Sequence, residues 1–183
     1  TKGTDERWVG TMAGLRPVKR LPALVEAFKG LPANWRLVIV GEGPEHAEIL
    51  AAAARWGCAD RVHLPGAVAD PAKVVGLFDI FALSSDSEQF PLSVVEAMAA
   101  GLPVASPAVG DVASIVALEN AQYTTPPGDS GARGAALAGL AKDADMRAAI
   151  GTANQRKAQE QFGKEAMIER YRRLYEAAAG CAF

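Results

Sequence analysis

Short apolar runs alternate with segments of helical spacing along most of the chain. These runs are short and uniformly apolar, as expected for strands that are buried on both faces of a sheet. Strands that alternate with helices pair in parallel through right-handed crossovers, so the pattern predicts an α/β fold with a doubly wound parallel sheet of about six strands. The expected strands are Trp8–Met12, Leu37–Val40, Val62–Leu64, Ile80–Leu83, Val104–Ser106 and Ala121–Thr124, and the expected helices between them are Leu21–Phe28, Pro44–Arg55, Pro71–Phe78, Pro91–Ala100 and Asp111–Leu118.

The strand pattern ends near Ser130, where segments rich in Ala, Glu, Arg and Lys favour helices. A turn at Thr125–Gly128 separates the two parts. A length of 183 residues fits one domain that buries about 70% of the surface of its unfolded chain. We therefore expect a single Rossmann-like domain over residues 1–183, with a helical tail that packs across the sheet or reaches another domain. The tail helices are expected at Ala135–Ala141, Ala144–Phe162 and Glu165–Ala178.

The charge balance and the cysteines argue against several classes of protein. The chain has 19 basic and 21 acidic residues and a net charge of -2, without the positive surplus of a nucleic-acid binder. Cys58 and Cys181 match no spacing of metal ligands and are expected to be reduced thiols. No apolar run has the length of a membrane span or the form of a signal peptide. We expect a cytoplasmic protein without a metal or a nucleic-acid partner, and any contact with the inner face of a membrane would come from a part of the protein outside this chain.

The segment EQFPLSVVEAMAAG, which begins at Glu88, predicts an anion site beside two carboxylates. Pro91 suits the first position of a helix, so we expect the helix to start there. The backbone amides of Leu92 and Ser93 then lie among the first-turn donors, which favour an anion such as phosphate. Glu88 and Glu96 can accept hydrogen bonds from hydroxyl groups, and a nucleotide sugar carries both phosphates and hydroxyls. Taken alone, the two glutamates would not indicate a site, because glutamates near a helix start are common and complement the helix dipole.

The loops that follow five of the expected strands all carry glycine, proline or other small residues. They read GTMAGLRPVK, GEGP, PGAV, SSDSEQFP and PAVGD. Ligands of a doubly wound sheet bind outside the carboxyl ends of its strands, where these loops lie. Glycine in one such loop requires no more than a tight turn, but five of these loops at one edge favour a binding site. Lys19, at the end of the first loop, can place an ammonium group over a phosphate there.

The order of these segments resembles a known family, most strongly through the block DIFALSSDSEQFPLSVVEAMAAGLPV and the VGDVASIV that follows it. The chain is similar over residues 8–178 to the C-terminal, donor-binding half of the retaining GT-B glycosyltransferases of family 4, also called the group 1 family. The resemblance implies a domain that binds a nucleoside-diphosphate sugar as co-substrate, with no metal or other cofactor. It also implies an N-terminal GT-B domain that carries the acceptor site and is absent from this chain.

The resemblance assigns roles to individual residues. Lys19 would contact the diphosphate and Glu88 would face the transferred sugar, and these two form the expected catalytic pair. Glu96 would accept hydrogen bonds from the ribose hydroxyls, and Gly66–Val68 would line the base through backbone groups. The remaining expected contacts with the donor come from Arg16, from Gly43 within the rim segment Gly41–Pro44, and from the backbone around Phe90, Pro91, Leu92 and Ser93.

The chain departs from the family pattern at three positions. Many relatives carry a second phosphate-binding basic residue five positions before the lysine, where this chain has Gly14, and Arg16 could substitute for it. Gln89 replaces a glycine that often follows the first glutamate, and Ser114 stands where a later acidic residue is usual. These departures imply a weaker donor affinity or a different preferred sugar.

The chemistry that this set of groups suits is stabilisation of the charge that develops on a departing β-phosphate. A hydrolase that used Glu88 and Glu96 as its acid and nucleophile would need both carboxylates to flank one bond, whereas Glu96 is expected farther along the helix. Two alternatives remain open. One is a nucleotide-sugar epimerase or phosphorylase with the same two-domain design, and the other is a non-catalytic GT-B-like domain that binds a nucleotide or a partner protein.

Overall fold

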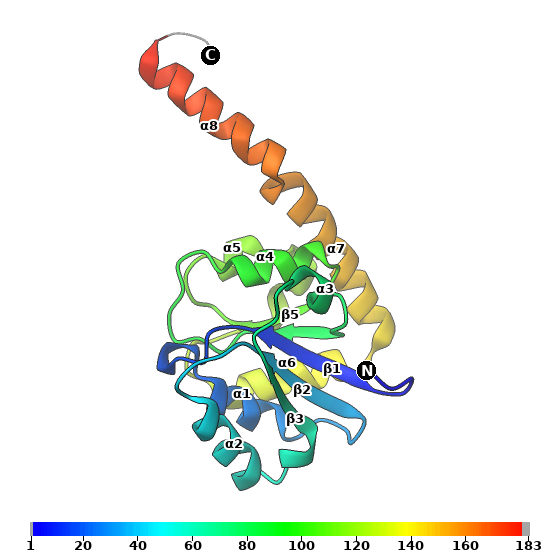
Figure 1. The fold of residues 1–183 in the computed structure, drawn as a ribbon. Helices are drawn as coiled ribbons and strands as arrows, with labels where there is room; N and C mark the ends of the chain where they lie inside the picture. Colours follow the sequence, from blue (N-terminus) through cyan, green and yellow to red (C-terminus); the bar gives the residue numbers. More distant parts are fainter. Residues whose placement is uncertain (1, 181–183) are drawn as a thin grey trace.

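The computed structural model describes residues 2–180 and contains a six-stranded parallel sheet in the order β3-β2-β1-β4-β5-β6 (Figure 1). This is the strand order of a doubly wound sheet, so the predicted fold class is confirmed. The strands are β1 (Arg7–Met12), β2 (Trp35–Val40), β3 (Val62–Gly66), β4 (Ile80–Ala82), β5 (Val104–Pro107) and β6 (Thr124–Thr125).

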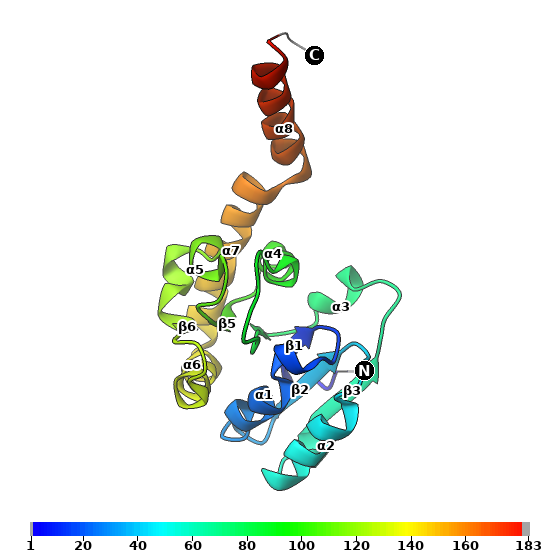
Figure 2. The same cartoon turned by 90° about the vertical axis from the view of Figure 1, so that its left-hand side faces the viewer.

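Helices cover both faces of the sheet, as Figures 1 and 2 show. Leu37 and Ile39 of β2 belong to one hydrophobic core, while Val38 and Val40 belong to another. Successive side chains of a strand point to opposite faces, so burial of both faces explains the uniformly apolar runs in the sequence. The helices are α1 (Leu21–Phe28), α2 (His46–Arg55), α3 (Ala72–Val75), α4 (Leu92–Ala99), α5 (Val112–Ile115), α6 (Ser130–Lys142), α7 (Ala144–Phe162) and α8 (Lys164–Ala179).

The two cores show which helices lie on which face. The first core contains Leu24 of α1, Ile49 of α2 and Leu137 of α6. The second contains residues of α3, α4 and α5, such as Met98. Helix α7 contributes to both cores, so it runs from one helical layer to the other, as Figure 2 shows.

Several predicted boundaries were wrong. Helix α3 is one turn long rather than spanning Pro71–Phe78, α5 ends at Ile115 rather than at Leu118, and α2 begins at His46 rather than at Pro44. In the tail, α6 begins at Ser130, earlier than expected, because the Asp129 side chain caps it by accepting a hydrogen bond from the Ala132 nitrogen. The other two tail helices match the prediction to within a residue at each end.

The expected last strand, Ala121–Thr124, is mostly a 3-10 helix, η3 (Leu118–Tyr123), and only Thr124–Thr125 pairs with β5. The side chain of Asn120 explains the difference. It is fully buried, accepts a hydrogen bond from the Val104 nitrogen and donates one to the Val104 carbonyl oxygen, both at 2.8 Å. The Asn120 side chain pairs with the backbone nitrogen and carbonyl oxygen of Val104 in β5. The backbone of residues 118–123 therefore does not pair with β5 as a strand, and it forms a 3-10 helix instead.

The tail packs on the sheet domain only in part. Helix α6 lies against α1, and α7 lies against α4. Asn154 anchors α7, since its side chain accepts a hydrogen bond from the Ala117 nitrogen and donates to the Leu102 carbonyl oxygen. Helix α8 has no buried residue and extends away from the sheet (Figure 1).

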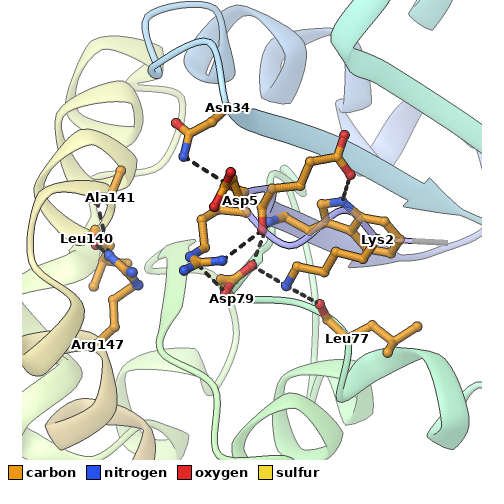
Figure 3. Close-up of polar contacts among 11 residues, drawn as sticks. Lys2, Asp5, Asn34, Leu77, Asp79, Leu140, Ala141 and Arg147 are labelled. Atoms are coloured by element: carbon orange, nitrogen blue, oxygen red, sulfur yellow. Dashed lines mark hydrogen bonds and ion pairs between the residues drawn. The ribbon is translucent and has the colours of Figure 1, made fainter.

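A polar cluster fastens the start of the chain at the amino ends of β1 and β4 (Figure 3). Asp79 accepts hydrogen bonds from the Lys2 ammonium at 2.6 Å and from the Trp8 nitrogen at 2.7 Å. Lys2 also donates to the carbonyl oxygen of Leu77. These contacts lie at the opposite end of the strands from the loops that the sequence marks as a site, so they support the fold rather than the site.

Candidate functional site

The sheet reverses its direction of winding between β1 and β4. These two strands are neighbours, but the chain continues from β1 to α1 on one face and from β4 to α4 on the other. A crevice forms at such a switch point, outside the carboxyl ends of the strands, and ligands of doubly wound folds bind there. The loops that carry Lys19 and Glu88 therefore both lie at this crevice.

Lys19 and Glu88, which are far apart in the sequence, are direct partners in the structure. The Lys19 ammonium donates to Glu88 Oε1 at 2.6 Å. The hydroxyl of Ser85, a buried residue three positions after the end of β4, donates to the same carboxylate oxygen, also at 2.6 Å. The sequence prediction that places Lys19 and Glu88 at one edge is consistent with this contact, and Ser85 is an addition that the sequence did not reveal.

Further hydrogen bonds join the two loops. The hydroxyl of Ser84 donates to the Lys19 carbonyl oxygen at 2.7 Å, and the Asp86 nitrogen donates to the Val18 carbonyl oxygen at 2.9 Å. Arg20 Nε lies 3.5 Å from a carboxylate oxygen of Asp86. The two loops consequently form one unit, which fixes the backbone on both sides of the Lys19–Glu88 pair.

Arg20 has a φ of 51° and is the one residue other than glycine with positive φ among those the structure describes. The left-handed conformation costs a residue with a side chain about 1–2 kcal/mol. Here it lets the chain turn sharply from the short 3-10 helix η1 (Pro17–Lys19) into α1, where Pro22 occupies an early position. Strain of this kind next to Lys19 is typical of functional loops.

The amino end of α4 follows the Glu88 loop after three residues. The helix begins at Leu92 and not, as expected, at Pro91, which has an extended conformation with ψ 99° and acts as the cap residue. The Pro91 carbonyl oxygen accepts a hydrogen bond from the Val94 nitrogen. Among residues 2–180, no hydrogen-bond acceptor pairs with the backbone nitrogens of Leu92 and Ser93. These two donors, together with the helix dipole, can bind an anion.

Phe90 and Gln89 connect Glu88 to this helix, and both are exposed. The ring of Phe90 lies edge-on to Phe162 of α7, with 5.6 Å between ring centres. This contact holds the Phe90 side chain away from Glu88 and on the side of the tail. The expected contact of the Phe90 backbone with a donor stays a prediction.

Glu96 lies in the second turn of α4 and is exposed. It lines a groove of about 440 Å³ between α4 and the segment that contains α3, together with Met12, Asp70, Pro71, Ala72, Val75, Ala99 and Ala100. This volume is within the usual range of about 300–1,000 Å³ for small-molecule sites. The groove does not include Glu88 among its lining residues, so the two glutamates border different parts of the site.

The segment Gly66–Val68 lies at the carboxyl end of β3, just before the residues that line this groove. Gly66 has a φ of 85°, and the Ala67 nitrogen donates to Glu42 Oε1 at 3.4 Å. Val68 packs against the second core. The backbone of this segment is therefore held in place from both sides.

Gly43 packs closely against the backbone of Leu15, in the loop that follows β1. A Cβ atom at this position would lie 2.5 Å from the Leu15 carbonyl oxygen, which is too close for any side chain. The Leu15 nitrogen also donates to the Glu42 carbonyl oxygen at 2.9 Å. Gly43 thus allows two loops to lie backbone against backbone, and this close approach explains the glycine.

Gly110, in the loop after β5, gives the same kind of support to Glu88. A Cβ atom here would lie 2.4 Å from the Glu88 carbonyl oxygen and 2.3 Å from that of Gln89, and the residue has a φ of 52°. The Asp111 nitrogen donates to the Gln89 carbonyl oxygen at 2.9 Å. Ser114 is exposed, and its hydroxyl donates to the Asp111 carbonyl oxygen.

Arg16 lies beside Gly14. The Arg16 Nε atom is 3.6 Å from the position that a Cβ of Gly14 would occupy. The guanidinium of Arg16 thus lies next to Gly14, the position at which the family resemblance implies a second basic residue. Within the described part of the chain, no acceptor pairs with this guanidinium.

Arg133 of α6 is a buried cation near the two joined loops. It is 2% exposed, and its Nε and Nη1 atoms have no hydrogen-bond partner within residues 2–180. Burial lowers the pKa of this guanidinium, and the positive charge of Arg20 lowers it further, while Asp86 and Asp129 raise it. Burying donors without partners costs free energy, so Arg133 is a candidate for a stabilising substitution.

Other titratable groups lie outside the site. Burial raises the pKa of the Cys58 thiol, and Cys58 is a free, buried cysteine. Cys181 lies outside the described residues. Over the part of the chain that the structure covers, no group of three or more His, Cys, Asp and Glu side chains is arranged to hold a metal ion. In the same part, no helix combines the length and the apolar character needed to cross a membrane.

The strand order and the helices on both faces of the sheet define the class of the protein, a Rossmann-like α/β domain. The family model "Glycosyl transferases group 1" matches residues 1–157. The chain therefore belongs to the glycosyl transferases group 1 family.

Two similar curated proteins illustrate the relationship. N-acetyl-alpha-D-glucosaminyl L-malate synthase of Bacillus anthracis is 28% identical over 90% of this chain and 44% of its own length. D-inositol 3-phosphate glycosyltransferase of Segniliparus rotundus is 36% identical over 62% of this chain and 27% of its own length. The chain spans less than half the length of these relatives.

Solved structures show the same fold. The crystal structure of Anabaena Alr3699/HepE in complex with UDP and glucose superimposes with a TM-score of 0.88 and 24% identity, over 94% of this chain and 49% of that one. Sucrose-phosphate synthase from Thermosynechococcus elongatus gives a TM-score of 0.82 and 28% identity, over 96% of this chain and 47% of the other. The domain corresponds to about half of each of these proteins.

Proposed function

We propose that this chain is the donor-binding half of a retaining, metal-independent glycosyltransferase that transfers a sugar from a nucleoside-diphosphate sugar to an acceptor. The observation that supports this most strongly is the contact of Lys19 with Glu88 at the switch point, in a loop that leads after three residues into α4. The groups offered to a donor are then the Lys19 ammonium, the Glu88 carboxylate and the two backbone nitrogens that open α4. A diphosphate matches the first and third, and the sugar hydroxyls match the second.

In this proposal the nucleotide lies along the carboxyl edge of the sheet. The ribose occupies the groove beside Glu96, whose exposed carboxylate can accept hydrogen bonds from hydroxyl groups. The base lies next to Gly66–Val68. The backbone of this segment is held by the hydrogen bond from the Ala67 nitrogen to Glu42 and by the packing of the Val68 side chain against the second core. The distal phosphate lies over the Leu92 and Ser93 nitrogens.

The reaction needs stabilisation of the charge that develops on the departing β-phosphate. Lys19 and the amides of α4 can supply it, and a fixed donor such as one of these amides is worth about 3–4 kcal/mol of barrier in well-studied cases. Arg16 adds a further positive charge beside Gly14. The Glu88 carboxylate accepts hydrogen bonds from the sugar.

A second domain would supply the acceptor site. The chain covers less than half of its longer relatives, so such a domain has a place in their sequences. Helix α8 carries exposed apolar side chains, including Tyr171 and Leu174, which line an apolar groove of about 460 Å³ with Phe90 and Leu92. An apolar face of this kind next to the donor site is where we propose that the acceptor domain packs.

Calorimetric titration of the purified protein with UDP, GDP and ADP tests the proposal. UDP is included because Alr3699/HepE was solved with UDP. We expect binding of at least one nucleotide, weakened by Lys19→Ala and by Glu96→Ala but not by the control substitutions Lys142→Ala and Glu160→Ala on exposed helix positions.

The rival function is a non-catalytic domain, which is favoured by the departures at Gly14 and Ser114. No binding of any of the three nucleotides at millimolar concentration would support that rival. Equal nucleotide affinity in the parent, Lys19→Ala and Glu96→Ala would contradict the proposed site even if a nucleotide binds. A nucleotide-sugar epimerase or phosphorylase would bind the same nucleotides, and turnover assays with the acceptor domain present would distinguish it.

A further inference from the structure

A single oxygen atom of Glu88 accepts two hydrogen bonds in the structure. Lys19 Nζ and Ser85 Oγ each lie 2.6 Å from Glu88 Oε1. Ser85 is 2% exposed, and the side chains of Glu88 and Lys19 are 13% and 26% exposed. The serine hydroxyl is thus the deeper of the two partners and the one that solvent or a ligand reaches less easily.

The two partners of Glu88 differ in what a diphosphate does to them. An ammonium group is a mobile charge on a flexible stem and can transfer its hydrogen bond to a phosphate. Ser85 has a short side chain in a buried position, three residues after β4, and cannot follow a ligand. A diphosphate that takes Lys19 away from Glu88 leaves the Ser85 hydrogen bond in place.

The backbone of Glu88 is already fixed, so its side-chain torsions are what remains to be set. The close approach of Gly110 and the hydrogen bond between Asp111 and Gln89 hold the main chain. A free glutamate side chain populates several rotamers, and ordering one of them costs entropy. A hydrogen bond to a charged acceptor is strong enough to select one.

From these contacts we propose that Ser85 is a positioning residue, which holds the Glu88 carboxylate toward the donor sugar once Lys19 has turned to the diphosphate. The inference rests on the proposed function, because it takes the ligand to be a nucleoside-diphosphate sugar. It assigns to Ser85 an effect on the sugar and none on the nucleotide. The site should accordingly lose its preference for a nucleotide sugar over the nucleotide when the hydroxyl is removed.

The experiment compares the dissociation constants of UDP and of UDP-glucose, UDP-galactose and UDP-N-acetylglucosamine for the parent and for Ser85→Ala. For the sugar nucleotide that the parent prefers, we expect Ser85→Ala to weaken binding about fivefold, the size of one ordinary hydrogen bond. The affinity for UDP should change less than about twofold. Ser85→Thr, which keeps the hydroxyl, should restore much of the preference, and Ser114→Ala is the matched control for loss of an exposed hydroxyl.

The same comparison is repeated with Ser85→Ala in the Glu88→Ala background. The Ser85 hydroxyl has no carboxylate to hold there, so its removal should not change the dissociation constant of the sugar nucleotide. The proposal is overturned if Ser85→Ala weakens UDP and the sugar nucleotide equally, if it weakens neither, or if it acts as strongly without Glu88. A parent that binds none of these ligands contradicts the proposed function itself, which is a different result. If Ser85→Ala does not fold, as judged by near-UV circular dichroism, Ser85→Cys provides a weak donor of similar size for the same comparison.

Discussion

The ion pair between Lys19 and Glu88 makes a quantitative prediction about nucleotide binding. A diphosphate that binds Lys19 has to take the ammonium from Glu88, 2.6 Å away, in a pair whose side chains are 26% and 13% exposed. A partly exposed pair of this kind contributes about 1 kcal/mol, near the upper end for surface pairs. A hydrogen bond from the ammonium to a phosphate contributes about 2 kcal/mol. The net gain that Lys19 provides to UDP binding is therefore about 1 kcal/mol.

Two substitutions and their combination separate these contributions. Glu88→Gln removes the competitor, so UDP should bind about fivefold more tightly, since 1.4 kcal/mol corresponds to tenfold. Lys19→Met should weaken UDP about fivefold in the parent but about 30-fold in the Glu88→Gln background, where the full phosphate contact is lost. Lys142→Met is the control for removal of an exposed lysine.

Isothermal titration calorimetry with UDP at fixed ionic strength measures the four dissociation constants of this cycle. The gain in Glu88→Gln should shrink at high salt, because screening weakens a partly exposed pair. Weaker UDP binding by Glu88→Gln than by the parent would refute the reasoning. The same loss from Lys19→Met in both backgrounds would also refute it, because Glu88 would then not compete for the ammonium.

Three further predictions concern the surroundings of the pair and the metal. Arg16→Ala should weaken UDP binding about fivefold, as expected for one exposed hydrogen bond worth about 1 kcal/mol, and an unchanged dissociation constant would show that Arg16 does not substitute for a basic residue at Gly14. Arg133→Met should raise the free energy of unfolding by about 1–3 kcal/mol, because it removes buried donors without partners, and a lower urea midpoint would contradict this. Prior treatment with EDTA should leave the UDP dissociation constant unchanged, whereas a loss that Mg²⁺ restores would contradict metal-independent binding.

The framework of the fold could be predicted from the sequence because burial on both faces gives a strand a recognisable composition. The run at Leu37–Val40 is an example, with successive residues in the two cores. Short helices such as α3 and α5 were overextended because local spacing does not show where a single turn ends. The 3-10 helix at Leu118–Tyr123 depends on the bonds of Asn120 to β5, a tertiary contact that the local sequence does not contain.

In the candidate site, too, the features that follow from the topology could be predicted, and those that depend on tertiary contacts could not. Lys19 and Glu88 could be placed at one edge because every loop that follows a parallel strand lies there. Ser85 and Gly110 could not be assigned, since their roles depend on contacts with Glu88. Ser85 lies only three positions before Glu88, and this spacing next to the end of a strand is the one signal that could have indicated it.

The most direct test of the account is a crystal structure of the protein soaked with UDP. We predict density for the β-phosphate within hydrogen-bonding distance of the Leu92 and Ser93 nitrogens, with the Lys19 ammonium turned toward it and the ribose beside Glu96. Density for the nucleotide at any other place, or a Lys19 that keeps its bond to Glu88 while UDP is bound, would contradict the account.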